Sequence, residues 1–148
     1  MKRFLFACLG HTCVALALAP AGRAPALAAA PTRVTVTGEV IDSWCYLTEI
    51  MYPLGTAHHQ CALWCAAGGI PVGILSDEGE VYIVLKMAGD DTSVANPALL
   101  EIQTHKITVE GQVIARDGMR YLLIERVVED FGIVNQTHED YGIQPFGE

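Results

Sequence analysis

The sequence Val34-Thr-Val-Thr-Gly-Glu-Val-Ile41 carries the clearest structural signal in the chain. Val34, Val36 and Val40 recur at even spacing, which is the period of a strand with one buried face. Gly38 falls in the same register, so we expect the strand to bend or bulge there. A similar phrase, Ile107-Thr-Val-Glu-Gly-Gln-Val113, predicts a second strand that bends at Gly111. We interpret the similarity as common strand chemistry and not as a repeat, because the flanking residues differ.

The remaining elements follow from turn signals and from the length of each apolar run. Residues 58–67 contain good helix formers and stop at Gly68-Gly69, which is typical of a helix end. In chain order we expect a strand at 34–41, a loop at 47–57, a helix at 58–67, a hairpin at 70–75 and 80–87, a short helix at 97–103 capped by Asn96, and a second hairpin at 106–115 and 119–128.

Five strands with a helix between the third and the fourth are typical of a small Greek-key barrel of the OB type. We therefore predict a mainly β fold with one OB-like barrel over residues 31–130. A helical insertion that carries the cysteines and histidines, residues 45–68, follows the first strand. Residues 131–148 form a polar tail that we expect to lie on the domain. A sandwich or an α+β roll fits the same order of elements.

The chain has 148 residues, of which 51% are hydrophobic, and this suffices for one domain. Residues 1–30 resemble a cleavable secretory signal peptide, with Lys2 and Arg3 before an apolar run and small residues near Ala28 and Ala30. The run is short for a membrane span, and we expect no other segment to cross a membrane. The sequence therefore predicts export to the periplasm or beyond; an uncleaved anchor is the alternative.

The charge of the chain argues against nucleic acid as a ligand. The formal net charge is −8, and removal of residues 1–30 would leave six basic and 17 acidic residues, a net charge of −11. A field of that sign repels phosphate backbones and favours cations, including metal ions. A solvated acidic surface explains the same composition.

Three cysteines remain after the predicted cleavage: Cys45, Cys61 and Cys65. On a helix, Cys61 lies about 60° and Cys65 about 20° from His58, so the three side chains share one face. His59 is turned away by about 100°. If the helix packs across the end of the first strand, Cys45 joins them in a set of three cysteines and one histidine.

Three thiolates and one imidazole suit Zn²⁺ in a closed tetrahedral site or Cu⁺ in a softer one. Export slightly favours copper, and Met51 is a further thioether candidate for it. We predict Cys45, His58, Cys61 and Cys65 as the metal ligands. Asp42 either accepts a hydrogen bond from His58 and orients it, or caps the turn that follows the strand.

Other thiol chemistries stay open at this point. An odd number of cysteines in an exported protein also fits one disulfide, from Cys45 to Cys61 or Cys65, with one thiol left over. A redox pair is a weaker alternative, since three residues separate Cys61 from Cys65 and a redox motif usually has two. Covalent haem is excluded because Ala66, and not a histidine, follows Cys65.

The aromatic and isolated polar residues have ordinary explanations. We expect Trp44, Trp64, Tyr46 and Tyr52 to form a small core between the insertion and the barrel. A wall around the site and a docking surface are the alternatives. We expect His105 and His138 to be solvated. We expect the glycosylation sequon Asn135-Gln-Thr137 to be a chance match.

The motif Gly38-Glu-Val-Ile-Asp42, Cys45-Tyr, His58-x2-Cys61-x3-Cys65 and Gly69-Ile-Pro-Val-Gly-Ile-Leu resembles a group of small, uncharacterised exported bacterial proteins with OB-like domains. The resemblance covers about residues 36 to 128, and its specific part is the cysteine-bearing motif. It implies an extracytoplasmic location and a cysteine and histidine site, and it brings no established activity.

Two functions follow from the sequence. The first is a periplasmic protein that binds or handles copper or zinc. The alternative is a non-enzymatic, disulfide-stapled OB-like module that binds a protein partner in the cell envelope. Because no phosphate loop, nucleophile elbow or pair of carboxylates stands out, we do not expect an enzyme.

Overall fold

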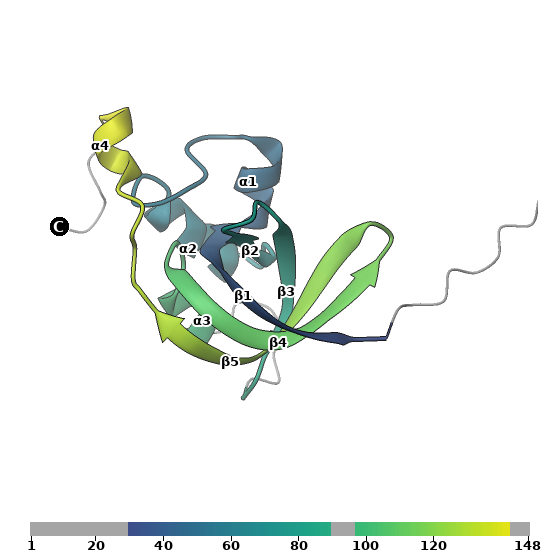
Figure 1. The fold of residues 1–148 in the computed structure, drawn as a ribbon. Helices are drawn as coiled ribbons and strands as arrows, with labels where there is room; N and C mark the ends of the chain where they lie inside the picture. The colour runs from purple at the N-terminus through teal and green to yellow at the C-terminus, as the bar shows by residue number, and fades with distance from the viewer. Residues whose placement is uncertain (1–29, 90–96, 143–148) are drawn as a thin grey trace, which may run out of the picture.

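A computed structural model describes residues 30–89 and 97–142 of the chain (Figure 1). Five strands close into a barrel in the order β1-β2-β3-β5-β4. They are β1 (Thr32–Asp42), β2 (Val72–Ser76), β3 (Val81–Met87), β4 (Lys106–Arg116) and β5 (Met119–Asp130). β3 and β5 are parallel, and the other neighbours are antiparallel. The predicted OB-like barrel is confirmed, and the sandwich and roll alternatives are wrong.

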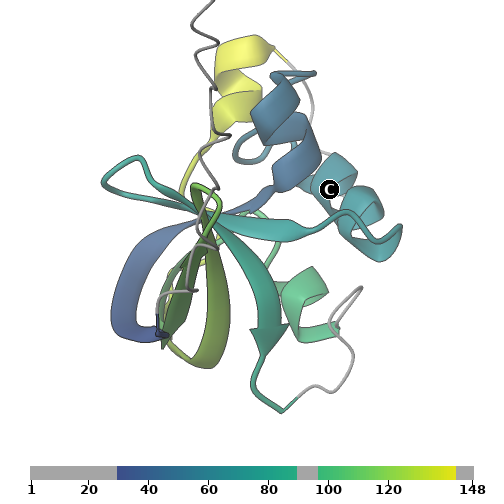
Figure 2. The same ribbon diagram turned by 90° about the vertical axis from the view of Figure 1, so that its right-hand side faces the viewer.

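Within the described residues, four short helices accompany the barrel: α1 (Ser43–Thr48), α2 (His59–Ala67), α3 (Pro97–Glu101) and α4 (Thr137–Tyr141). α1 and α2 form the insertion between β1 and β2, where the sequence predicted α2 alone, and α3 lies between β3 and β4 as predicted. Figure 2 shows α1, α2 and α4 at the same end of the barrel. α2 contacts both β1 and α3, so the insertion is packed against the barrel.

Two glycines allow the strands to bend and close the barrel. β1 pairs with β4 through residues 32–39 and with β2 through residues 38–42, so Gly38 has a partner on each side. A Cβ at Gly38 would collide with the carbonyl oxygen of Leu75, and one at Gly111 with that of Leu123. The predicted bends are therefore the places where strands approach too closely for any side chain.

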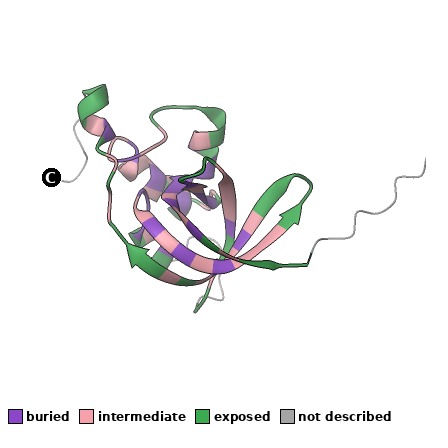
Figure 3. Cartoon of the chain, viewed as in Figure 1, coloured by how far each residue is buried: buried purple, intermediate pink, exposed green. Residues whose placement is uncertain are grey.

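Aliphatic side chains fill the barrel, and the helices contribute to the same core. Figure 3 shows buried positions alternating with partly exposed ones along β4, as the period of a strand requires. Ala66 of α2 and Leu99 of α3 belong to the cluster that the strands form. The main strand residues of this core are Val36, Val40, Ile74, Val84, Ile107, Val109, Leu122 and Ile124.

The structure departs from the prediction at two helices. α1 lies where the sequence suggested only a strand end and a loop, and α4 lies within the predicted tail. α4 rests on the insertion, since Thr137 Oγ1 donates to Leu54 O at 2.6 Å and the rings of Tyr52 and Tyr141 lie 4.2 Å apart. Both helices are too short to give a periodic signal. Three predicted features lie outside the described residues: the signal peptide up to residue 29, the Asn96 cap and the tail beyond residue 142.

The crowding at Gly38 predicts a large loss of stability in Gly38→Ala. The added methyl group meets backbone atoms of β2, which cannot move without breaking the barrel. We expect the free energy of unfolding in urea to fall by about 2–4 kcal/mol. Thr35→Ala, at an exposed position of the same strand, should cost less than about 1 kcal/mol. Equal losses in the two variants would contradict the account of the barrel closure.

Candidate metal centre

Asp42 ends β1 and begins α1. Its Oδ1 accepts hydrogen bonds from the backbone N–H of Trp44 at 2.9 Å and of Cys45 at 3.3 Å. This is an N-cap, and it satisfies two N–H groups that the first turn of a helix leaves without partners. Because the cap fixes the start of α1, Cys45 lies in the first turn with its side chain in the interior.

His58 occupies the corresponding position before α2. Its backbone N–H donates to Gly55 O at 3.1 Å, and its carbonyl accepts the first helical bond from Ala62 at 2.9 Å. Cys61 and Cys65 follow one and two turns later on the same helix. The helix stops at Gly68 and Gly69, after which Ile70 N–H donates to Cys65 O at 2.9 Å.

The two helix starts bring four potential ligands together. Asp42, Cys45, His58 and Cys61 each offer one atom, and these four atoms lie within 4.8 Å of one another. His58 Nε2 is 3.6 Å from Asp42 Oδ2. Cys65 is not one of the four, but its Sγ lies 4.0 Å from that of Cys61. The centre therefore joins the end of β1 to the beginning of α2.

Two of these atoms are buried without a hydrogen-bond partner. Asp42 Oδ2 and His58 Nε2 are both inaccessible to solvent, and neither has a partner at hydrogen-bonding geometry. At 3.6 Å from each other they are too far apart for a good hydrogen bond. Leaving such groups unsatisfied costs about 1–3 kcal/mol each, and more for a charged group. Both atoms point to a ligand that would satisfy them together.

The spacing fits a tetrahedral metal ion. Such an ion, with bonds of about 2.1 Å to nitrogen or oxygen and about 2.3 Å to sulfur, holds its ligand atoms about 3.4 to 3.8 Å apart. The separation of 3.6 Å between His58 Nε2 and Asp42 Oδ2 lies in this range. Small movements of the thiols would bring the other pairs to it, since all lie within 4.8 Å.

The protonation states of the histidine and the carboxylate suit a metal site. Burial lowers the pKa of His58 and outweighs the opposite effect of Asp42, so the imidazole is neutral at pH 7. Burial acts to raise the pKa of Asp42. The neighbouring thiols of Cys65 and Cys45 and two backbone N–H groups outweigh it, so the pKa is lowered and the group is a carboxylate. A neutral imidazole and a carboxylate are the forms that bind metal.

The thiols of Cys45 and Cys65 are protonated in the metal-free site. Burial, and then the Asp42 carboxylate, raise the pKa of Cys45 to about 12 and also raise that of Cys65. Cys45, Cys61 and Cys65, the cysteines among the described residues, are free in the structure. A metal ion would have to displace thiol protons, so its affinity depends on pH. The predicted disulfide from Cys45 to Cys61 or Cys65 stays a prediction for thiol counting to test.

Asp42, His59 and Met51 also entered the sequence analysis of the metal site, and only Asp42 lies in the cluster. Asp42 combines the two roles considered for it, since Oδ1 caps α1 while Oδ2 faces His58. His59 is outside the cluster, and its Nδ1 hydrogen bonds to Thr104 Oγ1 at 2.8 Å. Met51 is also outside it and is 65% exposed. The sequence did not identify Asp42 as a ligand, because an aspartate at the end of a strand shows the same local pattern when it only caps the following turn.

The prediction that the tryptophans form a core is wrong. Trp44 and Trp64 are 57% and 66% exposed. Each precedes a cysteine on a helix, and consecutive helical residues point about 100° apart. Because Cys45 takes the inner direction on α1, the residue before it faces outward.

His105 and His138, which the sequence analysis expected to be solvated, keep only part of their surface in solvent. Each is partly buried and hydrogen bonded, His105 to Asp130 at 2.9 Å and His138 to Thr56 at 2.6 Å. The sequon also lies in structured chain, because Thr137 is buried and Asn135 Nδ2 donates to Glu39 Oε2 at 3.3 Å.

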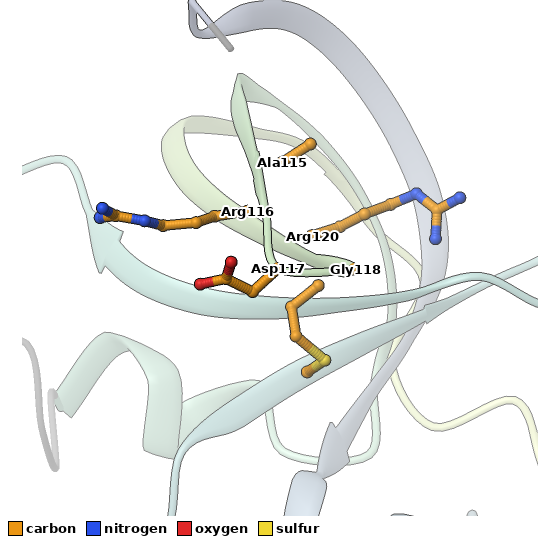
Figure 4. Close-up of a pocket in the computed structure, with 6 residues that line it drawn as sticks. Ala115, Arg116, Asp117, Gly118 and Arg120 are labelled. Atoms are coloured by element: carbon orange, nitrogen blue, oxygen red, sulfur yellow. The ribbon is translucent and has the colours of Figure 1, made fainter. Parts of the chain in front are cut away.

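A surface hollow in the turn between β4 and β5 offers no comparable chemistry. Its lining consists of six consecutive residues, Ala115, Arg116, Asp117, Gly118, Met119 and Arg120. Figure 4 shows the guanidinium groups of Arg116 and Arg120 pointing to opposite sides of the turn, so they do not converge on one anion. The metal-ligand cluster is therefore the better candidate site.

Comparison of the chain with protein-family models, curated proteins and solved structures gave no match. The resemblance to exported OB-like proteins thus stays a prediction, and the function is argued from the residues. Within residues 30–89 and 97–142, no helix has the length and apolar character needed to cross a membrane.

The raised pKa of Cys45 predicts an alkaline loss of stability in the metal-free protein. The folded chain holds this proton more tightly than the unfolded chain, so the stabilisation is complete below pH 9.0 and is lost toward pH 12. We expect the free energy of unfolding to fall over this range, by at most about 1.4 kcal/mol per pH unit from this group. Urea unfolding of chelator-treated protein measures it. Cys45→Ala should show a shallower dependence, and equal slopes would contradict the assignment.

Proposed function

We propose that this protein binds one metal ion through Asp42, Cys45, His58 and Cys61. The observation that carries the proposal is the pair of buried, unpartnered atoms, Asp42 Oδ2 and His58 Nε2, in a cluster with two thiols. A metal ion accepts electron pairs from all four atoms at once, which no hydrogen-bond partner among the described residues does. Binding would offset the cost of burying these groups.

Zn²⁺ fits the donor set better than Cu⁺. Zinc accepts sulfur, nitrogen and oxygen in tetrahedral sites, whereas Cu⁺ prefers thiolate and thioether sulfur. Charge leads to the same choice. With two thiolates, one carboxylate and a neutral imidazole, Zn²⁺ leaves one negative charge in a buried site and Cu⁺ leaves two, which is costlier. Copper is the alternative that metal analysis would identify.

The predicted signal peptide supports the proposal that the protein works outside the cytoplasm. Residues 1–30 combine a basic start, an apolar run and small residues before the barrel domain. In a bacterial host this corresponds to the periplasm or the medium. The intact mass of the protein recovered from a periplasmic extract shows whether residues 1–30 have been removed, and this tests the predicted export independently of metal binding.

A second candidate function is the disulfide-stapled module that binds a protein partner. One observation favours it: the insertion exposes several large apolar side chains, among them Trp44, Leu47, Met51 and Trp64. Tryptophan and methionine are enriched in protein interfaces. Cys61 also lies close to both other thiols, within 4.8 Å of Cys45 and 4.0 Å from Cys65, so oxidation could join two of them in a disulfide. Metal content and thiol count separate the two candidates.

The first prediction of the metal proposal concerns stoichiometry and the two adjacent histidines. The protein recovered from the periplasm without chelator or reductant, with the predicted signal peptide removed, should contain one zinc per molecule and show three titratable thiols after metal removal. His58→Ala should weaken zinc binding about 100-fold or more, because it removes a ligand. His59→Ala is the matched control, since His59 bonds to Thr104 instead. No metal with a single titratable thiol would contradict the proposal and favour the stapled module.

The second prediction separates the two roles of Asp42. Asn is as good an N-cap as Asp but offers an amide where the carboxylate oxygen faces His58. Asp42→Asn should therefore retain the helical circular dichroism of the metal-free protein and lose zinc affinity by about 10–100-fold. Asp42→Ala should lose the affinity and also about 1 kcal/mol of stability with the cap. Unchanged zinc affinity in Asp42→Asn would exclude Asp42 as a ligand.

A further inference from the structure

The cluster has a buried floor and a more accessible edge. Asp42, Cys45 and His58 are almost fully buried, at 1%, 3% and 1% exposure. Cys61 and Cys65, on one face of α2, are only partly buried. An ion at the centre would therefore reach solvent along the side that carries the two helix cysteines.

This edge carries one donor more than a four-coordinate ion needs. Cys65 is not among the four atoms that lie within 4.8 Å of one another. Its Sγ is 4.0 Å from Cys61 Sγ, and its thiol lies close enough to the Asp42 carboxylate for each to influence the other. Cys65 thus lies beside Asp42 on the buried floor and beside Cys61 on the accessible edge. A ligand that replaces Asp42 on the ion would have to come from such a position.

We propose, on the basis of the metal-binding function above, that Cys65 is an exchange ligand through which the ion enters and leaves. During exchange the metal–sulfur bond to Cys65 forms and the metal–oxygen bond to Asp42 breaks. The thiol proton goes to solvent water, and no oxidation occurs. The ion passes from one carboxylate, two thiolates and one imidazole to the three thiolates and one imidazole that the sequence suggests.

This exchange lowers the barrier to release because the ion keeps four ligands while it moves toward the edge. Without Cys65, Asp42 would have to leave before any replacement had bound. The ion would then be held by only three ligands until another one bound. Cys65 is therefore expected to control the rate of metal transfer much more than the affinity, and the site is suited to pass its ion on.

The test compares affinity with transfer rate in full-length, zinc-loaded protein. The acceptor is the chromophoric chelator 4-(2-pyridylazo)resorcinol, whose absorbance follows zinc release. In Cys65→Ser we expect nearly unchanged zinc affinity and a transfer rate at least about tenfold lower, equivalent to roughly 1.4 kcal/mol of barrier. Trp64→Phe, an exposed neighbour on the same helix, is the matched control and should transfer zinc at the wild-type rate.

A spectroscopic measurement checks the resting ligands independently. With Co²⁺ in place of zinc, the thiolate-to-metal charge-transfer band should have the same intensity in Cys65→Ser as in the wild type. In Cys61→Ser, which removes a resting ligand, the band should weaken.

The outcomes separate this inference from the proposed function. An unchanged transfer rate in Cys65→Ser overturns the exchange role while metal binding stands. A loss of affinity or of charge-transfer intensity as large as in Cys61→Ser also overturns it, since Cys65 would then be a resting ligand. An equal slowing in Trp64→Phe overturns it by showing a general effect of the helix. Failure of the wild type to bind Zn²⁺ or Co²⁺ overturns the proposed function itself.

Discussion

The two oxygens of the Asp42 carboxylate connect the local structure of this protein to its site. Oδ1 caps α1 through two backbone N–H groups, and this sets where the helix begins and where Cys45 lies. Oδ2 is left buried, without a partner and facing His58. One side chain thus orders the start of the insertion and creates a need for a ligand. The positions of the other donors follow from where α1 and α2 meet β1.

The barrel supplies the rigid support for this arrangement. Gly38 lets β1 change neighbours from β4 to β2, which carries the end of β1 to the helices. Ala66 packs α2 into the core of the barrel, so the helix face with Cys61 and Cys65 has a fixed orientation. A site held by a strand end and a packed helix is better ordered than a site on loops.

Much of the fold could be predicted because strand burial leaves a period of two in the sequence, as in Val34, Val36 and Val40. The site was harder to predict, for physical reasons. Helical spacing places His58, Cys61 and Cys65 on one face, but which donor reaches the interior depends on the packing of α1 against α2. Asp42 has the same local signal as a cap and as a ligand. The short α1 and α4 depend on tertiary contacts and leave no periodic pattern.

The coordination shell of the bound ion tests the central claim most directly. X-ray absorption spectroscopy on the zinc-loaded full chain reports the number and type of ligand atoms. We predict two sulfur atoms at about 2.3 Å and two nitrogen or oxygen atoms at about 2.0–2.2 Å, from Cys45, Cys61, His58 and Asp42. A shell of four oxygen or nitrogen atoms, or of a weakly held, hydrated ion, would contradict a metal centre built on these residues.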